Sequence, residues 1–266
     1  MRAYRLAYDG RPYHGFQRQP DVPTVEGALF DALRDLDALD GEKPDGYAAA
    51  GRTDAGVSAV AQTVAFDAPD WLTPRALNSG LPGTVRAWAS ADVSDGFHAT
   101  HDARTRAYTY HLYAPAVDDD RAGRALDALC GRHDFHNLTP ADENTVRDLA
   151  GSIDRDGDYL VLTLRAGGFV YELVRRVVSL VHAVAAGEAP LSKVDRVLGP
   201  DQVDGPEGVP PAPATPLVLT DVAYDVAFAL DPDAAASTRA AFEETRVERT
   251  TGARVAAELV RGVDRA

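Results

Sequence analysis

Alternation of apolar and polar residues is the main pattern along this chain. The runs have the two-residue period of strands with one buried face, and turn sequences such as Asp9-Gly10 and Gly167-Gly168 bound them. We therefore expect strands in residues 2–8, 60–66, 85–93, 103–113, 159–165 and 217–226.

Other segments have the spacing of helices, with apolar residues three and four positions apart. Thr24 is a candidate N-cap with Glu26 in the first turn, and apolar spacing continues from there to Leu39. Residues 72–81 predict a short helix that closes at Gly80. A later helix is predicted by the apolar face of Val170, Leu173, Val174, Val177, Val178 and Val181.

The order of these elements predicts an α+β fold with a mostly antiparallel sheet. Each half of the chain mixes strands and helices in a similar order, so we expect two similar lobes. We place an N-terminal lobe in residues 1–100 and a C-terminal lobe in residues 101–230. Residues 231–266 are Ala-rich and of mixed charge, and we expect a helical tail there.

The acidic composition changes the expected environment of the protein. The 266 residues include 41 acidic and 27 basic side chains, a formal net charge of −14, and only Lys43 and Lys193 are lysines. Self-repulsion at this charge destabilises a compact chain, and concentrated salt screens it, so a halophilic protein is expected. The alternative is an ordinary acidic enzyme. An acidic protein is a poor first choice for a nucleic-acid binder, although its arginines leave room for a local basic cleft.

Cysteine content and hydropathy narrow the protein class further. The single cysteine, Cys130, excludes an internal disulfide and a zinc–cysteine cluster. No apolar run approaches the ~18 residues of a membrane span, and no signal peptide is evident, so a cytoplasmic protein is expected. The pairs His98/His101 and His133/His136 could suggest a metal, but a site needs three or four converging ligands, and we predict none.

The strongest candidate for chemistry is a glycine-bracketed loop ahead of the strand at residues 60–66. Gly51 and Gly56 enclose Arg52 and Asp54, and glycine allows tight turns and close approach of a ligand. On these residues alone an ordinary turn is the commoner interpretation of Asp-Ala-Gly.

The loop sequence Gly-Arg-Thr-Asp-Ala-Gly-Val at residues 51–57 resembles the signature of the tRNA pseudouridine synthase A family (TruA), in which the aspartate is catalytic. Other blocks resemble the family in the same order, and the resemblance spans about residues 4–226. They are residues 8–19, 103–113, 131–135, 169–181 and 212–219. The composition makes this a haloarchaeal-like member.

The resemblance implies a pseudouridine synthase fold with an RNA cleft between the lobes. It also implies isomerisation of uridine to pseudouridine at positions 38, 39 and 40 of the tRNA anticodon stem-loop, by a homodimer without cofactor or metal. Asp54 matches the catalytic aspartate, Arg175 its arginine partner and Tyr108 a tyrosine at the target uracil. For substrate binding the resemblance points to Tyr108, Leu217, Arg52 and Thr53, with Arg52 filling the space left by a flipped base.

One position departs from the family pattern, because Ser58 stands where the family usually has histidine. This change puts a local RNA contact in doubt. Two alternatives remain open: a synthase of this family acting on a different RNA or uridine, and a non-catalytic RNA-binding relative. The first chemical step of Asp54 also stays open, between attack on the sugar, attack on uracil and removal of a sugar proton.

Overall fold

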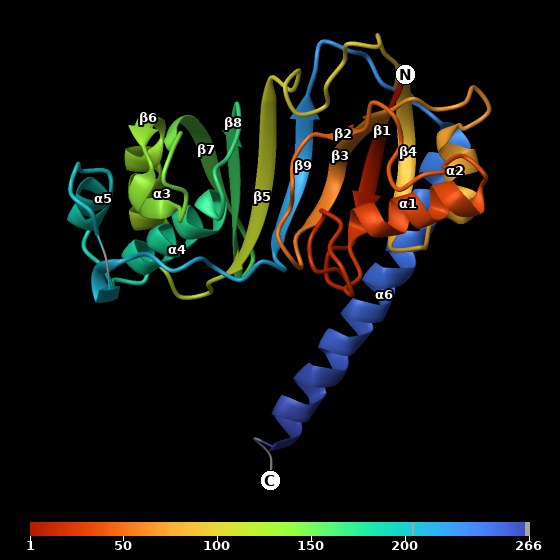
Figure 1. The fold of residues 1–266 in the computed structure, drawn as a ribbon. Coiled ribbons are helices and arrows are strands. Elements are labelled where there is room, and N and C mark those ends of the chain that lie inside the picture. The colour runs from red at the N-terminus through yellow and green to blue at the C-terminus, as the bar shows by residue number, and fades with distance from the viewer. Residues whose placement is uncertain (204, 264–266) are drawn as a thin grey trace.

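A computed structural model describes residues 1–203 and 205–263 and contains one ten-stranded sheet. The strands are β1 (Arg2–Tyr8), β2 (Ala48–Ala49), β3 (Ser58–Phe66), β4 (Val85–Asp92), β5 (Thr105–Tyr113), β6 (Gly131–Asp134), β7 (Val146–Asp156), β8 (Tyr159–Ala166), β9 (Leu217–Ala223) and β10 (Ala229–Leu230). Their order is β10-β4-β1-β3-β9-β5-β8-β7-β6, with β2 paired to β3 (Figure 1). Among the described pairings β3 and β9 are parallel and the others antiparallel.

Helices flank this sheet toward its two ends (Figure 1). They are α1 (Val25–Asp35), α2 (Pro74–Gly80), α3 (Asp119–Leu129), α4 (Leu173–Ala185), α5 (Ser192–Val197) and α6 (Pro232–Val263), with 3₁₀ turns at His136–Leu138 and Gly205–Glu207. The N-cap expected at Thr24 is confirmed, because its hydroxyl accepts a hydrogen bond from the Gly27 amide at 3.1 Å.

The core lies in two main clusters on one face of the sheet. Helices α1 and α2 pack with side chains of β1 and β3, and α3 and α4 pack with side chains of β5 and β8. Leu217 and Leu219 lie two residues apart on β9, so they point to the same face, yet one joins each cluster. Strand β9 therefore joins the two halves into one layer of sheet covered by helices.

The expected α+β fold with a mostly antiparallel sheet is confirmed. The division at residues 100 and 230 stays a prediction. Strands β9 and β10 come from the second range in sequence and pair with β3 and β4 of the first, so the sheet runs through both halves without interruption.

Helix α4 begins later than the apolar pattern predicts. The pattern places Val170 on the helix, but Glu172 adopts the left-handed conformation, with φ 61° and ψ −1°, and the helix starts at Leu173. Phe169 and Val170 consequently lie in the segment that leads into the helix.

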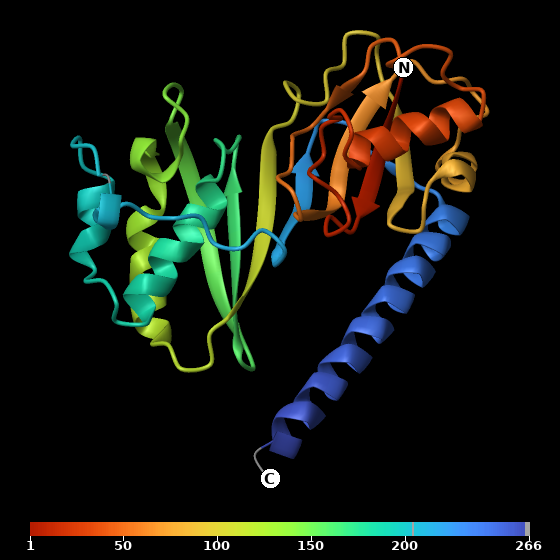
Figure 2. The same ribbon diagram turned by 60° about the horizontal axis from the view of Figure 1, so that its bottom comes forward.

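Helix α6 is the longest element and leaves the body of the molecule. Its first turns pack beside β4 and α2, where Ala234, Ala235 and Thr238 are buried. The remainder projects away from the sheet (Figures 1 and 2), and every residue from Arg246 to Val263 is exposed. In the described residues no helix is long and apolar enough to cross a membrane.

Candidate active site

The loop that carries Asp54 is fastened to the N-terminal loop of residues 9–16. The Phe16 amide donates to the Thr53 carbonyl at 3.0 Å, and the Gly56 amide donates to the Tyr13 carbonyl at 3.3 Å. Within the loop the Val57 amide closes a turn onto the Asp54 carbonyl at 3.1 Å. The backbone around Asp54 is thus fixed from both sides.

Two glycines make this fastening possible. A Cβ on Gly10 would stand 2.0 Å from the Val57 carbonyl oxygen, so the two segments approach more closely than any other residue allows. Gly56 has φ of 82°, a conformation that favours glycine.

Asp54 is paired with Arg175 at the start of α4. The two residues are 121 positions apart in sequence, and Arg175 Nη1 lies 3.0 Å from Asp54 Oδ2. Arg175 Nε also donates to the Ala212 carbonyl at 2.6 Å, which fixes the plane of the guanidinium. Both side chains are largely buried, with 19% of Asp54 and 15% of Arg175 exposed.

A second carboxylate, Glu172, lies near Arg175 and also pairs with the neighbouring Arg176. Glu172 Oε1 lies 3.9 Å from Arg175 Nη1, and Glu172 Oε2 accepts from Arg176 at 2.7 Å and 3.1 Å. Arg176 in turn donates to the Val209 carbonyl at 2.7 Å. Two acids and two bases therefore form one half-buried chain of alternating charge.

Burial raises the pKa of Asp54 above the ordinary value for aspartate, because it removes water from the carboxylate. The hydrogen bond and positive charge of Arg175 oppose this rise, and the negative charge of Glu172 adds to it. Pairing with Arg175 by itself favours the ionised form of Asp54, but the effect of burial is larger.

Aromatic and apolar side chains form a wall beside Asp54. The Tyr108 and Phe169 rings meet edge-on with centroids 5.2 Å apart, and buried Leu217 lies at the same cavity. Burial raises the pKa of Tyr108 to about 12, with a smaller contribution from the Asp54 charge. Tyr108 therefore keeps its phenolic proton at neutral pH.

The cavity around these groups has a volume of about 770 Å³ and draws on both halves of the chain. Its lining includes Asp54, Tyr108, Leu217 and Arg175, together with Arg18, Glu26, Lys43, Tyr47 and His98.

Two of the expected substrate-binding residues, Arg52 and Thr53, have different surroundings from one another. Arg52 lines the cavity and is exposed, and no hydrogen bond or ion pair joins it to another described residue. Thr53 is buried with 6% exposed and shares a 2.7 Å hydrogen bond with the Tyr8 hydroxyl, so its side chain supports the loop from behind. Contact of Thr53 with substrate remains a prediction.

Ser58, which stands in place of the family's usual histidine, does not line this cavity. Its hydroxyl accepts from the Gly10 amide at 3.1 Å, and it borders a different cavity between the sheet and α6.

Sequence reasoning missed Phe169 and Glu172 as site residues. A helical interpretation of residues 169–172 assigned them to a helix start, and only the left-handed Glu172 shows that they turn toward the cavity. A glutamate two residues before a Val-Arg-Arg run is the sequence signal that could have suggested this role.

Of the histidines singled out in the sequence, His98 lines the cavity, and His101, His133 and His136 do not. His98 and His101 rings lie 4.2 Å apart, and His133 Nε2 lies 2.9 Å from the Cys130 carbonyl oxygen. Among the described residues no group of three or more His, Cys, Asp or Glu side chains could hold a metal ion.

Comparison with known proteins identifies the family. The family model for tRNA pseudouridine synthase matches residues 125–225. The tRNA pseudouridine synthase A of Haloarcula marismortui is 60% identical over 99% of this chain and 100% of its own length. This chain belongs to the tRNA pseudouridine synthase A family.

Further relatives include the tRNA pseudouridine synthase A of Halobacterium salinarum, 60% identical over 97% of this chain and 98% of its own length. That of Methanosarcina mazei is 38% identical over 84% of this chain and 84% of its own length. The family expected from the Asp54 loop is therefore confirmed, with haloarchaeal relatives, and the chain is an isomerase of the pseudouridine synthase class.

Proposed function

We propose that this protein isomerises uridine to pseudouridine at positions 38, 39 and 40 of the tRNA anticodon stem-loop, with Asp54 as the catalytic carboxylate. The observation that carries the proposal is the Asp54–Arg175 pair, 3.0 Å apart, in a cavity walled by Tyr108 and Leu217. Family membership supplies the reaction type, and this geometry supplies a place for it.

The reaction moves one bond of the ribose and leaves the composition unchanged. The bond from C1′ to N1 breaks, the uracil turns, and C1′ bonds to C5. C5 then loses its proton, and N1 carries a proton in the product. Because product and substrate contain the same atoms, the reaction needs no oxidant, reductant or group donor.

Asp54 has the properties that each possible first step requires. Attack on the sugar, attack on uracil and removal of a sugar proton all use an ionised carboxylate held at a fixed position. Arg175 holds the carboxylate, and its own guanidinium is held by the Ala212 carbonyl. Burial raises the basicity of Asp54, which favours proton removal and bond formation alike.

The wall beside Asp54 is suited to hold a detached uracil. It consists of Tyr108, Phe169 and Leu217. The aromatic edges and the leucine offer an apolar surface for the ring, and the Tyr108 hydroxyl, which stays protonated, offers one hydrogen bond. The uracil must turn in place between the two bond-making events, so a fitted wall that keeps it near C1′ supports the second bond.

Arg52 suits a role in extracting the base from the stem. A uridine within a helix reaches an enzyme cavity only after it leaves the stack, and a long planar cation is able to fill the space. Arg52 is exposed at the cavity and makes no hydrogen bond to other described residues, so it is available to RNA.

The test is conversion of unmodified tRNA by the purified protein in molar salt, with pseudouridine located by mass spectrometry. One transcript carries uridine at positions 38, 39 and 40, and a matched transcript carries cytidine there. We expect product only with the first. Product at other uridines would reject the proposed positions and favour a synthase with another target. Binding without product would favour a non-catalytic relative.

We also propose that the enzyme works as a homodimer in the cytoplasm, without metal or cofactor. The homodimer and the site are tested separately, because oligomeric state is measured without substrate.

A further inference from the structure

Beyond Arg249, which pairs with Asp9 of the body, the projecting half of α6 has no packing partner among the described residues, although a helix of this composition needs one to be stable. From Val247 to Val263 all seventeen residues are exposed. Eight of these are glycine, threonine or valine, which have low helix propensity. Isolated helices of this length are marginal in water even with favourable residues, so we expect external packing to maintain this one.

The face of α6 that packs on the body continues beyond it as a stripe that is apolar at its free end, from Gly252 to Val263. Its positions alternate at intervals of four and three residues, the heptad spacing of helices that pack lengthwise. The stripe is Thr238, Phe242, Thr245, Arg249, Gly252, Ala256, Leu259 and Val263. Thr238 is buried against the body, whereas Leu259 and Val263 are 68% and 78% exposed.

On the opposite face of the sheet from α1–α4, a small cluster with Phe97 covers Ala3 and Ala65, but the part of that face next to α6 is open. Two neighbouring cavities of about 1090 and 590 Å³ lie there, and they share Ser58, Val218 and Arg249. We call them together the α6 groove. Apolar side chains line it, including Val60, Trp88, Val218, Leu230, Phe242 and Tyr113.

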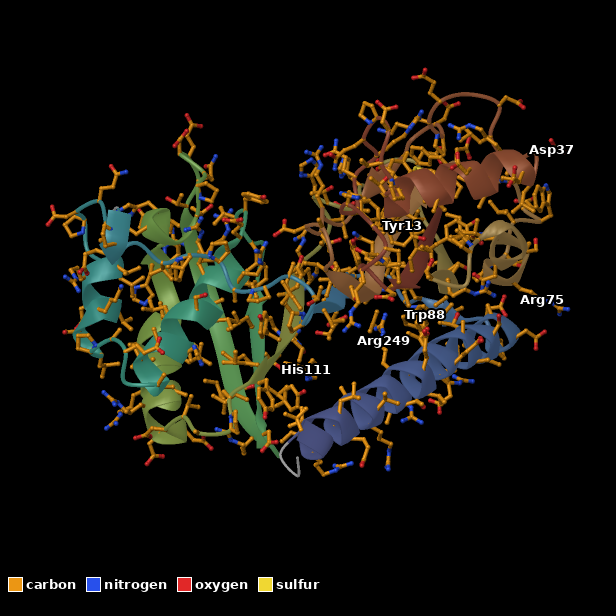
Figure 3. All side chains as sticks on the ribbon, turned by 90° about the horizontal axis from the view of Figure 1, so that it is seen from below. Tyr13, Asp37, Arg75, Trp88, His111 and Arg249 are labelled. Carbon is orange, nitrogen blue, oxygen red and sulfur yellow. The ribbon has the colours of Figure 1, made fainter. Side chains whose placement is uncertain are left out.

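Several of these groove residues are exposed although they are large and apolar. Val60, Leu230 and Tyr113 have 47%, 55% and 61% of their surface exposed. Figure 3 shows Trp88 and Arg249 between α6 and the sheet, with His111 nearer the free end of the helix. Exposed apolar surface of this extent is typical of an interaction site.

We infer that the α6 groove binds the projecting half of α6 from a second copy of this chain, so that two copies exchange helices around a two-fold axis. The inference rests on the homodimer proposed above and names its surface. A two-fold interface must be self-complementary, and this chain carries both members, the exposed apolar end of the α6 stripe and the apolar α6 groove.

Charge along α6 favours an antiparallel second copy. Residues 233–248 hold four acidic and two basic side chains, and residues 249–263 hold three basic and one acidic. Each half of the helix therefore carries two net charges, negative in the first and positive in the second. Antiparallel pairing sets the basic half of one copy beside the acidic half of the other.

Contact through α6 also adds little charge repulsion between two acidic chains. Its five acidic and five basic residues cancel, although the chain as a whole carries −14. A stable interface buries roughly 1,000 Å² or more. We expect two helix ends packed only on one another to fall short of this area. In an exchange of helices, the α6 stripe of each copy packs in the α6 groove of the other. The two-fold axis therefore creates two such contacts, and the buried area is the sum of both.

The test compares charge introduced on opposite sides of the free helix. Leu259→Asp places a charge on the stripe, and Val247→Asp places the same charge on an exposed valine on the far side. Val60→Asp places it in the groove. Sedimentation equilibrium in molar KCl gives the dimer dissociation constant, and hydrogen exchange follows the amides of residues 250–263.

We expect a wild-type dimer whose α6 amides are protected. Leu259→Asp and Val60→Asp should each raise the dissociation constant by about 100-fold or more, since a charge is buried without a partner. Both should also abolish protection in α6. Val247→Asp should change the constant by no more than about two-fold.

Three results would overturn the inference. They are a monomeric wild type at all concentrations, a dimer that survives Leu259→Asp, and a dimer that survives Val60→Asp. Pseudouridine formation is measured on the same samples. A wild-type monomer that modifies tRNA would overturn the interface alone, and an inactive dimer would overturn the proposed function alone.

Discussion

Glu172 holds a carboxylate oxygen 3.9 Å from the Arg175 guanidinium that binds Asp54. The position depends on the left-handed backbone of Glu172, which ends the approach to α4 and turns the side chain back over the first helical turn. Glu172 and Arg175 therefore act on Asp54 in opposite directions: the first raises its pKa and the second lowers it.

This opposition predicts two opposite shifts in the pH dependence of activity. Asp54 acts when ionised, so activity falls as the pH drops through its pKa, which burial sets above that of an ordinary aspartate. Glu172→Gln removes a negative charge, lowers the Asp54 pKa and should move the acid limb to lower pH. Arg175→Gln removes a positive charge and should move the limb to higher pH.

The measurement is kcat/KM for pseudouridine formation against pH for both variants and the wild type. Tyr108 at the same cavity has a pKa that burial raises to about 12, so it stays neutral over the range. A loss of activity without movement of the limb would mean that Glu172 only supports the fold. If the acid limb moved in the same direction in both variants, the opposed roles of Glu172 and Arg175 would be contradicted.

Asp54→Asn tests the catalytic carboxylate itself. The change keeps the size and most hydrogen bonding of the side chain but removes its charge, so we expect a rate loss of about 1,000-fold or more with tRNA affinity nearly unchanged. The control, Asp156→Asn, removes an exposed charge at the end of β7 and should keep full activity. Asp54→Asn turnover at a tenth of the wild-type rate or better would reject the mechanism.

Sequence patterns predicted the parts of this fold that depend on local alternation. In β8, Leu160, Leu162 and Leu164 are buried, and the residues between them face the other side, as a two-residue period requires. The loop around Asp54 was found because its chemistry lies in consecutive residues. Its partner Arg175 was placed only by family resemblance, because a separation of 121 positions conceals a contact that the fold creates.

Other features could not be predicted because no local pattern encodes them. Strand β7 has Leu149 as its one fully buried residue, so it lacks the alternation of a core strand. The parallel pairing of Ser58 with Val218 joins segments 160 positions apart and makes the sheet continuous. Glu172 was missed because an apolar helical period does not reveal a left-handed residue at its start.

A matched pair of glycine substitutions tests the fastening of the Asp54 loop. A Cβ on Gly10 would collide with the Val57 carbonyl, whereas a Cβ on Gly51 would meet nothing within 4 Å. Gly10→Ala should lower the free energy of unfolding by about 1–3 kcal/mol and reduce activity, because Val57 and the loop must shift. Gly51→Ala should change stability by less than about 1 kcal/mol.

Urea denaturation of both variants in constant high salt measures the difference. Equal free energies of unfolding would show that the loop of residues 9–16 can shift without destabilising the fold. The close approach of Gly10 to Val57 would then have no structural importance.

Arg52→Ala tests whether this arginine acts after the base leaves the stack. It should lower kcat by about 10-fold or more and change tRNA affinity by less than about three-fold. Arg18→Ala is the control, since Arg18 lines the same cavity but its guanidinium donates to the Glu42 carbonyl at 3.2 Å. It should leave kcat largely intact. An affinity loss for Arg52→Ala as large as its rate loss would assign Arg52 to binding.

Salt dependence follows from the charge of −14 and from where the acidic residues lie. Asp154 and Asp156 are exposed on β7, and no ion pair joins either of them to another described residue. At about 1 M salt the screening length is ~3 Å, but at about 0.1 M it is ~10 Å, long enough for such charges to repel one another. We expect the fold and activity to be lost as KCl is dialysed away.

Circular dichroism and pseudouridine formation, followed together as KCl falls from molar to about 50 mM, measure this dependence. Asp154→Asn with Asp156→Asn should lower the KCl concentration at half-unfolding, because two repelling charges are gone. Asp154→Glu with Asp156→Glu keeps both charges and should leave that midpoint in place. If the wild type stays folded and fully active at about 50 mM, charge repulsion does not limit its stability. If the neutral and charged pairs shift the midpoint equally, the effect comes from the side chains of β7 and not from their charge.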